Sequence, residues 1–349
     1  MMKSEHQLNI ELLRIFAMFY IVLGHLSCVI GDYNELNWLE KLILYIPFGF
    51  VPGVNCFVLI SSYFLINAQF KAQRIVRIAV ETLFYTVILT VVCFFFFNKN
   101  GEITVYDILK SFYILGPTKY NYWFISTFIA LLALQPFLSK LAMSLTKGQY
   151  QLFLCVLIFI NTDLIGGFPF GGLYGGGFTL MWFICLFFTG GYLRLHAKSH
   201  SMKFWLLLTI FFTLVKTVIQ YMGWTNIISL SYNSIIIYGL AIGVFMLFKS
   251  IRISRINNFV KFISPNILGV YLIHEHGFKY LYRDELTYQL SQSLYWNKLA
   301  YLIIWSLLIF IICVFIDKLR QKLFIALYLN ELENKISMWL QNKYGTFKL

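Results

Sequence analysis

The sequence predicts an all-α integral membrane protein: a single bundle of about ten transmembrane helices with both termini in the cytoplasm. Three observations predict this fold class. The 349 residues are 59% hydrophobic, 19% aromatic and only 12% charged, a composition that excludes an ordinary soluble domain. Apolar runs of about 20 residues, the length that crosses a hydrocarbon core of about 30 Å, recur along the chain. Lys and Arg residues also collect in alternate loops.

Ten apolar runs are predicted to cross the membrane, and they leave little chain for a domain outside it. They cover residues 8–30, 42–66, 77–97, 121–139, 150–165, 179–195, 203–222, 230–248, 259–281 and 298–317. The fifth run is short for a span, and the ninth becomes polar at its end. We therefore predict one membrane domain over residues 1–317.

Three further segments have a composition of their own. Residues 98–120 are polar enough for an amphipathic or re-entrant segment on the outer side. Residues 163–178 are rich in glycine and aromatic residues, which suits either sugar stacking at a cavity mouth or the aromatic belt of the membrane interface. Residues 318–349 alternate charged and apolar side chains, a pattern that predicts a cytoplasmic amphipathic tail.

The formal net charge of +13 follows the membrane topology and does not indicate a nucleic-acid partner. With Lys3, one set of alternate loops holds sixteen cations, and the intervening set holds seven. Cytoplasmic loops carry the excess of Lys and Arg, so both termini are expected in the cytoplasm and the number of spans is even. Some attraction to anionic membrane lipid is also expected.

A metal site or a disulfide framework is not predicted. The six cysteines lie inside apolar runs without a C-x-x-C motif, which is typical of small buried side chains. The H-x-H motif of His274 and His276 could bind a metal, but the sequence offers no evident third ligand. We expect His274 to form hydrogen bonds in an outer cavity.

The first apolar run carries the strongest functional signal. Arg14 and His25 lie eleven residues apart within it, and Glu11 precedes Arg14 by one turn. An arginine near the membrane centre costs about 2.5–3.5 kcal/mol, so such a residue is a functional candidate by default. Eleven residues are about three helical turns, which places both side chains on one stripe about 16 Å apart. A histidine here is either a hydrogen-bonded structural residue or a general base, and the shared face favours the base.

A pair of arginines stands at the cytoplasmic start of the third run. Arg74 and Arg77, with Lys71 nearby, lie on adjoining faces of a helix start, where guanidinium groups can hold phosphate bidentately. The same cations are also what the topology rule alone predicts. Both interpretations remain open from the residues themselves.

Five motifs, in order and in register, resemble acyltransferase family 3, whose members are integral-membrane enzymes that O-acylate surface sugars. Residues 9–14 with His25 resemble its opening R-x10-H signature, and Arg74 with Arg77 resembles its arginine pair, without the proline that often follows. Residues 56–63 resemble its F-F-x-L-S-G-Y pattern, with Ser62 in place of the glycine. The last two motifs are Trp123-Phe124 with Pro136, and Gly269 to His274. The resemblance covers residues 8 to about 317.

The resemblance implies transfer of an acyl group, acetyl by default, from cytoplasmic acetyl-CoA to a sugar hydroxyl outside the cytoplasm. The acceptor would be a cell-surface polysaccharide or a lipid-linked sugar, and the membrane would be the bacterial plasma membrane. Carried over residue by residue, His25 and Arg14 would be the catalytic pair, and Arg74 and Arg77 would bind the donor. We expect Tyr63, Trp123 and His274 to contact substrate.

The chemistry of these residues agrees with such a transfer. An imidazole can deprotonate the acceptor hydroxyl as it attacks a thioester carbonyl. A cation about 16 Å away cannot touch the same carbonyl, so Arg14 is expected to orient the pantetheine or diphosphate end of the donor.

Two other classes of protein fit parts of the pattern. A multi-span transporter or flippase for a sugar or lipid-linked glycan has the same topology, but the chain lacks internal repeats and paired broken helices. The unrelated membrane-bound O-acyltransferase fold has its catalytic histidine deep in the chain, where His274 stands. Release of free coenzyme A by the purified protein separates an acyltransferase from a carrier.

Overall fold

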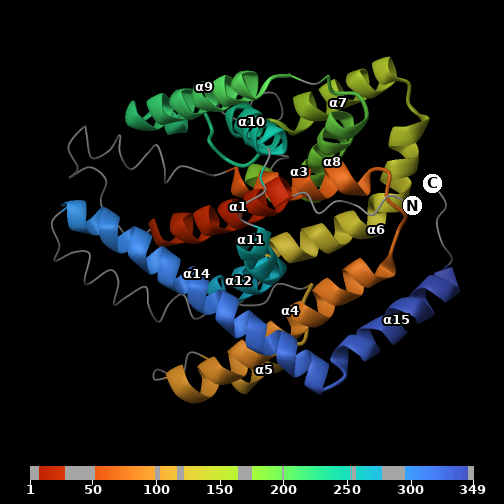
Figure 1. Cartoon of the computed structure of the whole chain (residues 1–349), viewed down its shortest axis with the longest axis vertical. Coiled ribbons are helices and arrows are strands. Elements are labelled where there is room, and N and C mark those ends of the chain that lie inside the picture. The colour runs from red at the N-terminus through yellow and green to blue at the C-terminus, as the bar shows by residue number, and fades with distance from the viewer. Residues whose placement is uncertain are drawn as a thin grey trace. The chain divides into compact units, whose positions relative to one another are not determined.

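The computed structural model is all-α and describes residues 8–27, 52–98, 103–115, 122–163, 175–198, 200–251, 253, 257–276 and 295–344 (Figure 1). The contacts divide the chain into two compact units, whereas the sequence predicted a single bundle. Much of the second predicted span and most of the loop 163–178 lie outside the described residues.

Unit 1 comprises residues 1–25, 32–66 and 142–267. Its helices are α1 (Leu8–Ser27, except the last two residues), α3 (Gly53–Leu65), α7 (Lys147–Asn161), α8 (Leu180–Leu195), α9 (Met202–Tyr221), α10 (Ile235–Ser250) and α11 (Asn257–Ile263). Helix α3 packs on α8 and α10, while α9 packs on α10 and α7 on α8. The outer side of α9 exposes Leu207, Phe211 and Leu214, as expected for a face against lipid.

The contact between α3 and α8 depends on small residues. A Cβ on Gly190 of α8 would lie 2.7 Å from the Cβ of Ser62 on α3, closer than packed atoms allow. Ser62 is fully buried, and its hydroxyl bonds the Val58 carbonyl at 2.6 Å. The serine that replaces the motif's glycine is thus accommodated because α8 supplies a glycine opposite it.

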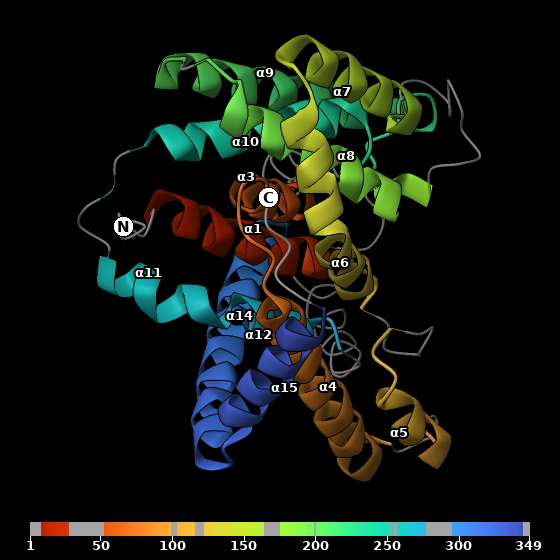
Figure 2. The same cartoon turned by 90° about the vertical axis from the view of Figure 1, so that its right-hand side faces the viewer.

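Unit 2 comprises residues 26–31, 67–141 and 268–349. Its helices are α4 (Ala72–Val92, continued by a π turn to Phe97), α5 (Val105–Ser111), most of α6 (Trp123–Ser144), α12 (Ile267–His274), α14 (Tyr295–Ala326) and α15 (Leu329–Tyr344). Helix α15 lies along α4 in both views (Figures 1 and 2). Gln73 bonds Asn334 at 2.7 Å, and Gln341 bonds the Phe70 carbonyl at 3.2 Å, so α15 is bonded to the start of α4 and to the residues just before it.

Within the described residues, five helices are long and apolar enough to cross a membrane: Leu8–Ser27, Ala72–Phe97, Trp123–Ser144, Met202–Tyr221 and Ala300–Ala326. Three shorter apolar helices, α3, α8 and α10, match further predicted runs. The chain is therefore a multi-pass membrane protein.

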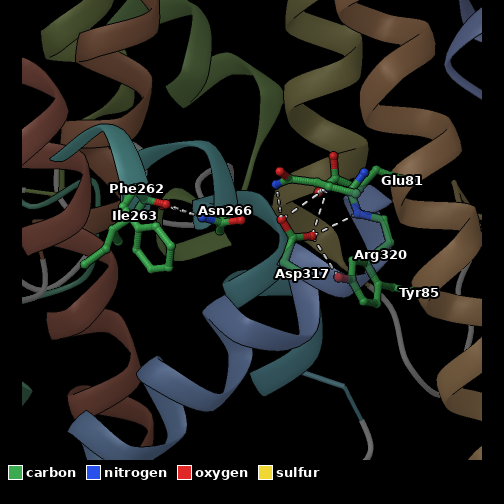
Figure 3. Close-up of polar contacts among 8 residues, drawn as sticks. Glu81, Tyr85, Phe262, Ile263, Asn266, Asp317 and Arg320 are labelled. Atoms are coloured by element: carbon green, nitrogen blue, oxygen red, sulfur yellow. Dashed lines mark hydrogen bonds and ion pairs between the residues drawn. The ribbon is translucent and has the colours of Figure 1, made fainter. Parts of the chain in front are cut away.

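One predicted span differs from the structure. The predicted ninth span, 259–281, is not continuous, because the chain forms a 3₁₀ turn at Ser264–Asn266 between α11 and α12. Pro265 in this turn has no N–H to continue the helix, and Asn266 Nδ2 bonds the carbonyls of Phe262 and Ile263 at 2.7 and 3.2 Å (Figure 3). The end of the membrane domain at residue 317 stays a prediction, and helix α14 itself continues to Ala326.

Candidate active site

The N-terminal half of α1 holds an oriented arginine. Arg14 Nη1 bonds Glu11 Oε1 at 3.0 Å, which confirms the partner that the sequence suggested. The Ser264 hydroxyl donates to the other oxygen of Glu11, so the carboxylate is fixed from two sides. The side chain of Arg14 is 35% exposed and that of Glu11 14%. The Arg14 side chain is therefore held in place while part of it stays exposed.

His25 lies near the other end of α1 and is exposed, whereas Leu23 and Leu26 beside it are buried. A Cβ added to Gly24, the residue before it, would meet no atom within 4 Å. The helix is regular from Leu8 to Ser27, which gives a rise of about 16 Å between residues 14 and 25. The two residues share one helix but cannot touch one small group together.

Two cations lie against the ring of Tyr63, Arg194 and Lys249, and both belong to the loop cations from which the topology was predicted. Its ring is 4% exposed on α3, and its hydroxyl accepts a hydrogen bond from Arg194 Nη1 at 3.2 Å. The Arg194 guanidinium lies 4.9 Å from the ring centroid and the Lys249 ammonium 4.8 Å. We call these three residues the Tyr63 cluster. The signal in the sequence was that Arg194 and Lys249 each stand in the last turn of an apolar helix.

In unit 2, the predicted donor arginines lie in the first two turns of α4. Arg74 is half-buried, and its Nη1 bonds the Gln69 carbonyl at 3.2 Å. Arg77 is exposed. Burial raises the pKa of the Glu333 carboxyl on α15, and the charges of Arg77 and Arg320 act in the opposite direction. Arg77 thus lies within electrostatic reach of α15.

A buried charged cluster connects α4 to α14, and sequence reasoning missed it (Figure 3). Arg320 Nη2 lies 3.0 Å from Glu81 Oε1 and 2.9 Å from Asp317 Oδ1. The carboxylate of Asp317 also accepts from the Tyr85 hydroxyl and from Gln321, both at 2.8 Å. The side chains of Glu81, Asp317 and Arg320 are 2%, 0% and 6% exposed. We call Glu81, Tyr85, Asp317 and Arg320 the Arg320 cluster.

This cluster also fixes the approach of α12. A Cβ on Gly269 would overlap the carboxylate of Asp317, so only glycine permits this contact. The clue available in the sequence was one acid and one arginine three residues apart, at the end of an apolar run.

The two remaining predicted site residues lie at the ends of α6 and α12. Trp123 is half-buried at the start of α6. His274 is 3% exposed, and its Nδ1 lies 2.7 Å from the Val270 carbonyl. The Tyr122 hydroxyl donates to the Leu272 carbonyl at 2.6 Å, and the rings of Phe124 and Tyr271 lie 5.8 Å apart. Unit 2 therefore brings the Trp123 and His274 motifs together.

Comparison with known proteins agrees with these motifs. The model of the acyltransferase domain of acyltransferase family 3 matches residues 7–318, which is most of the chain. No curated protein and no solved structure matches. The protein is an enzyme that acts on acyl groups, and its chain belongs to the acyltransferase 3 family.

Proposed function

We propose that the enzyme is an O-acetyltransferase that moves an acetyl group from cytoplasmic acetyl-CoA to a hydroxyl of an extracytoplasmic sugar. The acceptor is a cell-surface polysaccharide or a lipid-linked sugar, and the enzyme resides in the bacterial plasma membrane. The observation that carries the proposal is on α1, where an exposed imidazole follows an oriented, partly open arginine on the same helix. This pairing supplies a base and a cation within a membrane span.

In the proposed reaction, His25 accepts the proton of the sugar hydroxyl while the oxygen of that hydroxyl attacks the thioester carbonyl. The new C–O bond forms, the C–S bond breaks, and the coenzyme A thiolate leaves with the bonding electrons. That thiolate then takes up a proton, so the transfer consumes none overall. Arg14, oriented by Glu11, stabilises negative charge on the donor at a distance from the reacting carbonyl.

The donor and acceptor would use different parts of the chain. Arg74 and Arg77 suit the phosphates of acetyl-CoA, and the exposure of Arg77 supports this role. Tyr63, Trp123 and His274 remain candidates for substrate contact. The half-buried ring of Trp123 is suited to stack on a sugar, whereas Tyr63 and His274 are buried and would act through their polar atoms.

The test uses purified protein in lipid nanodiscs with acetyl-CoA. Free thiol is measured with and without an isolated surface polysaccharide, and polymer acetylation is read by NMR. We expect thiol release that rises with acceptor and matches the acetyl groups gained. A transporter or flippase would release no coenzyme A, and this result would reject the proposal. Labelling of a cysteine engineered at Gly176 from outside tests the topology, because labelling only after permeabilisation would reverse it.

A further inference from the structure

The Tyr63 cluster gathers two positive charges around one buried ring. Arg194 from α8 and Lys249 from α10 both lie within 5 Å of the Tyr63 ring centroid, although 54 residues separate them in the chain. Like charges repel, so such a convergence requires something that compensates for it. Among the described residues, neither cation forms an ion pair with a carboxylate.

The carbonyls at the end of α10 are bonded without the Lys249 side chain. A lysine in the last turn often serves the unbonded carbonyls at a helix C-terminus. Here Asn9 of α1 donates to the carbonyls of Phe248 and Lys249, at 3.1 and 3.0 Å. The Lys249 ammonium is therefore directed at Tyr63 instead of at the end of its own helix.

The Tyr63 hydroxyl completes the arrangement. It accepts from Arg194, so its own proton is available to donate in another direction. The groups that meet at Tyr63, a guanidinium, an ammonium and a hydroxyl donor, are groups that bind phosphate oxygens. The ring itself is fixed by its burial and by Phe245, whose centroid lies 5.4 Å away.

We propose that Arg194, Lys249 and the Tyr63 hydroxyl form a binding site for a phosphate group in unit 1. The phosphate belongs either to the coenzyme A donor or to the head group of an anionic lipid. The first source rests on the proposed function, and the second does not. The residues of this site belong to unit 1, whereas Arg74 and Arg77 belong to unit 2.

The test compares a double variant, Arg194→Gln with Lys249→Gln, with a matched control, Lys198→Gln with Lys203→Gln. The control removes the same charge from two exposed lysines that make no contact with Tyr63. Coenzyme A and dephospho-coenzyme A are titrated calorimetrically into protein in phosphatidylcholine nanodiscs. Retention of phosphatidylglycerol in mixed nanodiscs is measured by native mass spectrometry.

If the phosphate belongs to coenzyme A, the double variant loses about tenfold or more in coenzyme A affinity, because it lacks two charge-assisted hydrogen bonds. For lipid as source, coenzyme A binding is unchanged and retained phosphatidylglycerol falls about tenfold. Tyr63→Phe, which keeps the ring, shows a smaller loss in the same assay. Equal behaviour of the double variant and the control in both assays overturns the site. Loss of lipid in a protein without transferase activity would uphold the site while rejecting the proposed function.

Discussion

Two arginines make the same local contact in two different surroundings. Arg14 on α1 and Arg320 on α14 each follow an acidic residue by three positions and bond it, at 3.0 and 2.9 Å. The side chain of Arg14 is 35% exposed and has one carboxylate partner among the described residues, whereas that of Arg320 is 6% exposed and has two. The sequence pattern is the same, and the surroundings differ.

The difference separates a group that can bind a ligand from one that holds the fold. A guanidinium has five N–H donors, and Arg14 has one carboxylate partner among the described residues in a side chain that is partly exposed. The donors of Arg320 are directed at Glu81 and Asp317, so its charge connects α4 to α14. An arginine in an apolar helix is therefore a functional candidate only when part of it remains accessible.

The largest effect is expected at His25, on the open side of this comparison. His25→Gln should lower acetyl transfer by about 10²–10⁴-fold, because glutamine can form hydrogen bonds but cannot accept the proton. The melting temperature of this variant should change little, because glutamine keeps a hydrogen-bonding side chain at this exposed position. Transfer is measured as acetyl content of the surface glycan at matched protein level. Near-normal acetylation would assign His25 a structural role.

The second-largest effect is expected at Arg320, the buried arginine of this comparison. Arg320→Met leaves Glu81 and Asp317 without their cation, and breaking a buried pair in this way costs about 3–5 kcal/mol of folding stability. Thermal unfolding in detergent should show a large loss, with little folded protein recovered. Adding Glu81→Gln and Asp317→Asn should restore part of it. A stable but inactive Arg320→Met protein would instead place Arg320 in the reaction.

A smaller effect is expected at the donor arginines. Arg74→Ala with Arg77→Ala should weaken coenzyme A binding about tenfold or more through lost charge-assisted bonds. Lysine at both positions should restore only part of the affinity, because a point charge lacks the bidentate geometry. Calorimetric titration of coenzyme A measures both variants. Unchanged binding in the alanine variant would leave these residues as topology signals alone.

The smallest effect is expected at Glu11. Glu11→Gln keeps the hydrogen-bonding shape but removes the charge opposite Arg14. Because the arginine is partly exposed, the stability loss should stay below about 1 kcal/mol. Turnover should fall a few-fold as Arg14 loses its orientation. A stability loss as large as that of Arg320→Met would show that the two arginines do not differ as their exposure indicates.

Local sequence patterns were enough to predict much of this structure. The Glu11–Arg14 pair was predictable because both residues lie one turn apart on one helix, and apolar length located α4, α6 and α9. The Arg320 cluster was not predictable, because Glu81 and Arg320 are 239 residues apart and no local pattern connects them. The Tyr63 cluster was missed for the same reason. The break at Pro265 could have been predicted, because proline cannot continue a helix. It was missed because residues 259–281 were assigned to one span by their hydropathy.

Helix α14 has a length that a membrane must accommodate. Its 32 residues extend about 48 Å, well beyond a hydrocarbon layer of about 30 Å. From Ala300 to Asp317 the rise is about 26 Å, so the Arg320 cluster falls near one boundary of that layer, where charge is better tolerated. Hydrophobic mismatch then acts on the Arg320 cluster. A thicker bilayer places the cluster inside the hydrocarbon layer, and a thinner bilayer leaves it among the head groups. The acyl-chain length of the surrounding lipids therefore sets the environment of the Arg320 cluster.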